Sequence, residues 1–140
     1  MFDNGVAEQD DLKAAILYLN NKGFENIYLA GYSFGANINS LVVSKGCEIC
    51  DHIMVSPPMK FFNFDDIEKM PCTGLVITGD NDDIAPVHLI DKALTRWGIN
   101  PRYEIIDNCD HFYLKRLDAL KSVLIDYLSK LNLVNKKEVL

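Results

Sequence analysis

The sequence predicts an α/β protein with a mostly parallel sheet and helices on both of its faces. Three observations support this fold class. Short strand-like segments alternate with segments of helical periodicity along the chain. The strand-like segments are apolar throughout instead of alternating with polar residues, as expected for strands buried on both faces. Serine, aspartate and histidine side chains follow the carboxyl ends of these segments, where such sheets bind their ligands.

Composition limits the number of domains, the partners and the location that can be expected. The chain has 140 residues, 49% hydrophobic and 24% charged, which suits one domain with a core. The net charge of −6 argues against a nucleic-acid partner or an anionic membrane. No apolar run approaches the ~20 residues of a membrane span, and no signal-peptide pattern follows Met1. Four cysteines do not form a disulfide framework at this length, so a reducing, cytoplasmic location is expected.

The first helix is expected over residues 6–22, after a polar loop over residues 1–5. Acidic residues in its first turns suit the helix dipole, and Gly23 is a plausible stop. Its apolar stripe at i, i+3, i+4 and i+7 consists of Leu12, Ala15, Ile16 and Leu19. An apolar strand is then expected over residues 26–30.

The stretch Gly31-Tyr32-Ser33-Phe34-Gly35 lies between this strand and a helix expected over residues 36–45. Strand, G-x-S-x-G and helix together are typical of a nucleophile elbow. A serine at the tip of so tight a turn has a strained backbone, and small residues at Gly31, Gly35 and Ala36 would let strand and helix approach. The alternative is a glycine-bracketed turn with an idle serine.

The rest of the chain predicts three more strands and two more helices. These are a strand over residues 53–55, a strand over 74–78, a helix over 86–97, a strand over 102–106 and a helix over 114–131. The apolar stripe of the last helix is Leu117, Leu120, Leu124, Tyr127, Leu128 and Leu131. Residues 1–131 therefore form one domain, and residues 132–140 form a tail. Residues 59–71 are expected to be irregular, and Phe61, Phe62 and Phe64 within them suit core packing or a dimer contact better than an acyl pocket.

Candidate catalytic residues follow three of the four strands, in the order serine, aspartate, histidine. Among the histidines, His52 precedes its strand and His88 falls in the first turn of a helix. His111 alone follows a strand at the same edge as Ser33, where an imidazole can take a serine proton and return it. Several aspartates could supply the carboxylate that orients it. Spacing leaves both Asp82 and Asp83 open, with Asp80 at the strand end and Asp107 as an outside candidate.

The chain resembles the carboxyl-terminal two-thirds of an α/β-hydrolase of the compact, dienelactone-hydrolase-like group. The matching residues are Phe2-Asp3-Asn4-Gly5 with Glu8 and Asp11, the elbow with Ala36, Ser56-Pro57-Pro58, Gly79-Asp80-Asn81-Asp82 with Pro86, and Asp110-His111-Phe112. The resemblance implies Ser33 as nucleophile, Asp82 of the G-x-x-D turn as acid and His111 as base. It also implies the backbone N–H of Phe34 as an oxyanion donor. The cysteine nucleophile of dienelactone hydrolases proper is absent.

The departure from that family lies at the amino end. The family fold begins three or four strands earlier, and its second oxyanion donor comes from a loop among those strands. Met1 would then be an internal methionine of a longer protein or the start of a truncated or split gene product. The first strand becomes a sheet edge open to pairing with another chain, and the last helix lacks a neighbour.

The expected function is hydrolysis of a small carboxylic ester or a similar acyl bond. The alternative is an inactive remnant, or a subunit completed by a separate amino-terminal piece. A flavodoxin-like or dinucleotide-binding sheet would need a G-x-G-x-x-G turn, which is lacking. The expected partners are the acyl substrate and either a second copy or the complementing fragment, with no cofactor. The C-x-x-C pair Cys47 and Cys50 has no second half, so no metal is implied.

Overall fold

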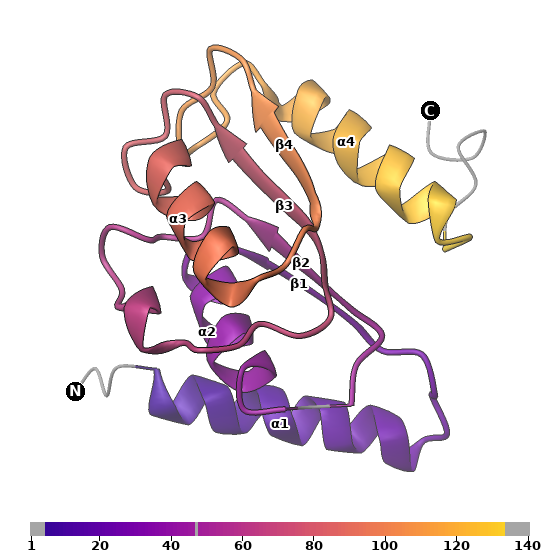
Figure 1. Cartoon of the computed structure of the whole chain (residues 1–140). Coiled ribbons are helices and arrows are strands. Elements are labelled where there is room, and N and C mark those ends of the chain that lie inside the picture. The colour runs from indigo at the N-terminus through magenta and orange to yellow at the C-terminus, as the bar shows by residue number, and fades with distance from the viewer. Residues whose placement is uncertain (1–4, 47, 134–140) are drawn as a thin grey trace.

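A computed structural model describes residues 5–46 and 48–133 of the chain (Figure 1). The elements are α1 (Val6–Asn21), β1 (Tyr28–Tyr32), α2 (Phe34–Val43), β2 (Asp51–Val55), the 3₁₀ turn η1 (Phe64–Asp66), β3 (Thr73–Gly79), α3 (Val87–Trp97), β4 (Arg102–Ile106) and α4 (Leu117–Lys130). The expectations for residues 1–4, Cys47 and the tail beyond residue 133 lie outside the described residues. Among the described helices, none is long and apolar enough to cross a membrane.

The four strands form one parallel sheet in the order β1-β2-β3-β4. Each strand therefore pairs with the next strand in the sequence, and all four carboxyl ends lie at one edge of the sheet (Figure 1). The predicted fold class is confirmed. Within the described chain β1 pairs only with β2, so the expectation that β1 is an edge strand is confirmed as well.

Two hydrophobic clusters cover the two faces of the sheet. Met54 of β2 and Val76 of β3 belong to the cluster that includes residues of α1, α2 and α3. Their neighbours Ile53 and Leu75 point the other way, into the cluster beneath α4. Residues that point to either face are apolar in these parts of β2 and β3. Each of the two strands therefore contains a continuous apolar run in the sequence.

The first helix packs through a narrower face than the periodicity predicts. Ala15, which belongs to the predicted stripe, is exposed, whereas Ile16 and the polar Gln9 are buried. The side chain of Gln9 donates to the carbonyl oxygen of Gly5 and accepts from Lys45 beyond the end of α2. α1 contacts chiefly α2, so a thin stripe of contact suffices.

The last helix has no fully buried side chain. Leu117 of its predicted stripe is the first residue of α4 and is 64% exposed. The other members of the stripe are half-buried. The hydroxyl of Tyr127 donates to the buried carboxylate of Asp51 at 2.6 Å and so ties α4 to β2.

The three phenylalanines of residues 59–71 have different surroundings. Phe64 is buried against Trp97, in agreement with core packing. Phe62 is half-buried, and its ring contacts that of Phe34 beside the elbow. Phe61 is 67% exposed and belongs to neither core cluster.

Candidate active site

The turn at Ser33 is as tight as the sequence predicts. β1 extends to Tyr32, two residues beyond the predicted strand, and α2 begins at Phe34, so Ser33 alone makes the turn. Its backbone has φ 50° and ψ −115°, a strained conformation for a residue with a side chain. The N–H of Ser33 donates to the carbonyl oxygen of Val55 at 2.9 Å, which fixes the turn to the end of β2.

The two glycines of the elbow have different roles. A β-carbon on Gly31 would lie 2.5 Å from the carbonyl carbon of Gly35 and 2.6 Å from the nitrogen of Ala36. Gly31 is therefore required for the close approach of strand and helix, as predicted. A β-carbon on Gly35 would meet no described atom within 4 Å, and the φ of Gly35 is not positive. The steric reason predicted for Gly35 is wrong, because the backbone of Gly35 makes the contact with Gly31 and the space where its own β-carbon would lie is open.

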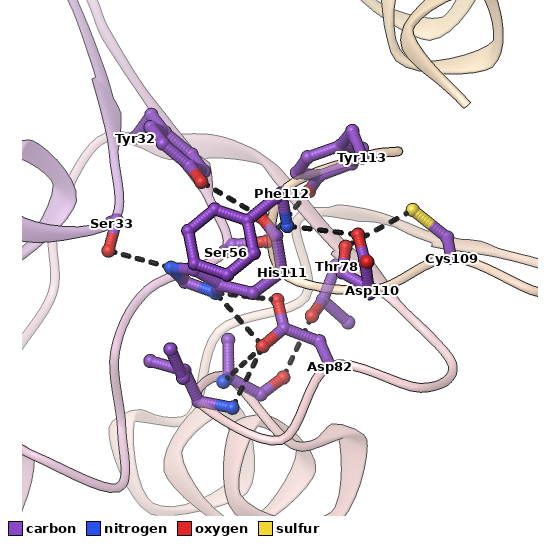
Figure 2. Close-up of polar contacts among 12 residues, drawn as sticks. Tyr32, Ser33, Ser56, Thr78, Asp82, Cys109, Asp110, His111, Phe112 and Tyr113 are labelled. Atoms are coloured by element: carbon purple, nitrogen blue, oxygen red, sulfur yellow. Dashed lines mark hydrogen bonds and ion pairs between the residues drawn. The ribbon is translucent and has the colours of Figure 1, made fainter. Parts of the chain in front are cut away.

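Ser33, His111 and Asp82 form a continuous chain of hydrogen bonds (Figure 2). The Nε2 atom of His111 lies 2.8 Å from the hydroxyl oxygen of Ser33. Its Nδ1 atom lies 2.9 and 3.0 Å from the two carboxylate oxygens of Asp82. His111 and Asp82 are buried, whereas Ser33 is half-buried. The arrangement has the geometry required for a hydroxyl activated by an oriented imidazole.

Asp82 is fixed by the loop that contains it. One carboxylate oxygen accepts hydrogen bonds from the backbone N–H groups of Ile84 at 2.9 Å and Ala85 at 2.7 Å. The other aspartates that the sequence left open, Asp80, Asp83 and Asp107, are exposed. Of the described residues, Asp82 is thus the aspartate bonded to His111.

Asp80 has a different structural role, which is to join two loops. Its carboxylate accepts from the backbone N–H of Cys109 at 3.0 Å, and these backbone bonds lower the pKa of Asp80. The N–H of Asn81 donates back to the carbonyl oxygen of Cys109, also at 3.0 Å. The two bonds join the loop after β3 to the loop after β4, which brings Asp82 and His111 together.

The remaining histidines and the nearest thiol lie outside this chain of hydrogen bonds. His52 is fully buried within β2, and His88 is exposed in the first turn of α3. Cys109 is buried and lies two residues before His111 in the sequence. Its burial and the nearby Asp110 raise the pKa of its thiol. A neutral, enclosed thiol is a poor nucleophile, so Ser33 remains the candidate at this site.

Two tyrosines and a serine, to which the sequence motifs assign no role, complete the surroundings of His111. The hydroxyl of Tyr32 donates to the carbonyl oxygen of His111. The hydroxyl groups of Tyr113 and Ser56 lie 2.7 Å apart in the interior. Burial raises the pKa of Tyr113, so this phenol stays protonated. One signal was present in the sequence: Ser56, like Ser33, directly follows a strand.

Comparison with known proteins places this geometry in context. No protein-family model matches the chain. An uncharacterized protein of Rickettsia prowazekii is 31% identical over 137 residues, which cover 91% of this chain and 58% of that protein. An α/β serine hydrolase homologue from Coxiella burnetii is similar in structure, with a TM-score of 0.80 and 28% identity over 91% of this chain and 62% of its own.

A third relative is an α/β serine hydrolase without lid from Xanthomonas campestris, with a TM-score of 0.82 and 28% identity. It matches 93% of this chain and 59% of its own. The chain thus spans about six-tenths of the length of these relatives. The matching part is the carboxyl-terminal part of the α/β-hydrolase fold.

Proposed function

We propose that this chain, which has the carboxyl-terminal part of an α/β-hydrolase fold, provides the Ser-His-Asp triad of a serine hydrolase. The substrate would be a small carboxylic ester or a similar acyl compound. The observation that carries the proposal is the hydrogen-bonded chain from Ser33 through His111 to Asp82. The similarity to α/β serine hydrolases supports it.

In the proposed reaction the hydroxyl oxygen of Ser33 attacks the acyl carbon while Nε2 of His111 accepts its proton. The tetrahedral intermediate collapses, the bond to the leaving alkoxide breaks, and His111 returns the proton to it. Water then attacks the acyl-enzyme with the same base and releases the acid. Asp82 accepts the Nδ1–H of His111 throughout, which fixes the tautomer and stabilises the imidazolium.

The developing oxyanion needs donors beside Ser33. α2 begins at Phe34, and the positive end of its dipole faces the reacting centre. The backbone N–H of Phe34 is the donor that we assign to the oxyanion. One such donor contributes roughly 10²–10³ in kcat. A second donor would come from the part of the fold that precedes β1 in longer relatives.

The surroundings of Ser33 favour a small substrate. The segment after β2 contains only the short turn η1 and leaves no room for a cap domain over the site. A related hydrolase from Xanthomonas campestris is likewise described as lacking a lid. With Ser33 half-buried and no cap domain after β2, an ester with a short acyl group can reach the hydroxyl without a lid having to open.

A second candidate, a catalytically weak chain or a subunit completed by a separate amino-terminal piece, has its own support. The chain spans 58–62% of the relatives reported above. β1, an apolar strand, also has a partner on one side only within the described residues. Both observations fit a chain that contains the triad and depends on a separate piece of protein for part of the surrounding site.

The experiment measures turnover of a short-chain aryl ester and labelling by a fluorophosphonate. Ser33→Ala should abolish both. Ser44→Ala is the matched control, because Ser44 lies just after α2 and its hydroxyl only donates to the carbonyl oxygen of Leu41. Labelling that persists in Ser33→Ala would contradict the assignment, and a wild-type chain that takes no label would favour the second candidate.

A further inference from the structure

The ring of Tyr32 lies against the His111 imidazole (Figure 2). The two ring centroids are 5.4 Å apart, and the planes are tilted by only 31°. Phe112 contacts the same imidazole at 5.4 Å with its plane perpendicular. The face of a tyrosine ring is negative, so it attracts a cation placed over it within ~6 Å. The His111 ring lies within that distance.

The hydroxyl group of Tyr32 makes a second contact with the same residue. It donates to the backbone carbonyl oxygen of His111 at 2.9 Å. The ring and the hydroxyl therefore act on the side chain and on the main chain of His111 respectively. Tyr32 is well placed for this because it ends β1, immediately before the strained turn at Ser33.

The Tyr32 hydroxyl remains a hydrogen-bond donor over the pH range in which the site would work. Partial burial raises the pKa of Tyr32, and the negative charges of Asp82 and Asp110 raise it further. The phenol thus stays protonated wherever a histidine base operates. The edge of the Tyr113 ring, 6.2 Å from the Tyr32 ring, limits how far that ring can swing away.

We propose that Tyr32 is a positioning residue for His111: its hydroxyl fixes the backbone that carries the imidazole, and its ring favours the imidazolium formed during proton transfer. This inference rests on the proposed function and assigns a role to the second residue of the G-x-S-x-G turn. The charged and titratable groups around His111 are Asp82 from the loop after β3, Tyr32 from β1, and Cys109, Asp110 and Tyr113 from its own loop. Substitution of Tyr32 leaves the other four in place.

Two variants separate the two contacts. Tyr32→Phe removes the hydroxyl and keeps the ring, so the pKa of His111 should stay near its wild-type value while the rate of fluorophosphonate labelling falls about fivefold. Tyr32→Leu also removes the ring, so the pKa of His111 should fall by about half a pH unit and labelling by a further tenfold or so. Tyr28→Phe, in the same strand and half-buried, is the control that should change neither quantity.

The pKa of His111 is read by NMR of histidine-labelled full-length chain, with the resonance assigned from a His111→Gln variant. If Tyr32→Leu matches Tyr28→Phe in both pKa and labelling rate, the inference is overturned. If wild-type chain takes no label, the proposed function fails, and the NMR titration alone decides whether Tyr32 acts on His111. A labelling loss in Tyr32→Leu with an unchanged pKa would overturn the role of the ring.

Discussion

The carbonyl oxygen of Cys109 occupies the space that a β-carbon on Gly79 would need. Gly79 ends β3, and Cys109 lies in the loop that follows β4, so the two backbones are in direct contact where their strands end. This contact permits the hydrogen bonds between Asp80, Asn81 and Cys109 that join the two loops. The distance between Asp82 and His111 is therefore set by a glycine that is three residues from the carboxylate.

Replacement of Asp82 by asparagine should lower kcat on the order of 10⁴-fold, because the amide lets His111 adopt the wrong tautomer. Asp83→Asn is the matched control. Asp83 is the next residue in the same loop, and its side chain is exposed. Asp80→Asn should also cost far less than Asp82→Asn. Steady-state hydrolysis of an aryl ester measures all three, and a large loss in Asp83→Asn would show that the assignment is off by one residue.

Gly31→Ala should destabilise the protein, whereas Gly35→Ala should not. The new methyl at Gly31 would meet backbone atoms of Gly35 and Ala36, which cannot move without opening the elbow, so unfolding free energy should fall by about 1–3 kcal/mol or more. At Gly35, in the first turn of α2, alanine meets nothing described and should be neutral or stabilise by up to ~1 kcal/mol. Urea unfolding of the two variants makes the comparison. Equal losses would mean that the elbow is not as tight as described.

The buried histidine of β2 should make the protein less stable in acid. Burial lowers the pKa of His52 from 6.5 to about 4, and its Nε2 atom has no partner among the described residues. Between these values the unfolded chain binds a proton that the folded chain excludes. The stabilisation is therefore complete above pH 6.5 and declines as the pH falls towards 4.

The expected size of this effect is about 2 kcal/mol between pH 7.5 and 5. The measurement is the change in unfolding free energy between the two pH values, taken from urea unfolding of wild-type protein and compared with the same change in His52→Leu. His88→Leu removes an exposed histidine and serves as the control. If wild-type protein and His52→Leu lose stability equally on acidification, His52 is charged in the folded state.

An amino-terminal segment containing the strands that precede β1 in longer relatives should raise activity and solubility together. Such a segment would pair with the open edge of β1, cover the half-buried face of α4 and supply the second oxyanion donor. Sedimentation and esterase rate, measured with and without the segment in cis or as a separate fragment, give both readouts. A monodisperse monomer that is fully active as the 140-residue chain would contradict this prediction.

Much of the fold follows from local patterns in the sequence. The strand over residues 102–106 has the predicted bounds, since it is bordered by a proline before it and polar residues after it. The strand predicted over residues 26–30 lies two residues later in the structure, because nothing local distinguishes Gly31 and Tyr32 as strand or turn. Their extended conformation comes from pairing with Met54 and Val55, residues over twenty positions away.

The site was harder to predict than the fold for the same reason. Serine and histidine could be selected because each follows a strand and has few competitors. Spacing alone leaves four aspartates open, and only the resemblance, through its G-x-x-D turn, favours Asp82. The Ile84 and Ala85 N–H groups and the joined loops that hold Asp82 in place have no local sequence signal. Tyr32 occupies a variable position of the G-x-S-x-G motif, so the motif itself predicts no role for it.

The strand order β1-β2-β3-β4 also has a consequence for the growing polypeptide during synthesis. Each new strand can join the edge left by the one before it, so the sheet can extend in the direction of translation. Ser33 enters with the first of these strands, Asp82 after the third and His111 after the fourth. A nascent or prematurely released chain that stops short of His111 holds an ordinary, unactivated serine. In the proposed mechanism, such chains cannot hydrolyse esters until the loop after β4, which contains His111, has folded.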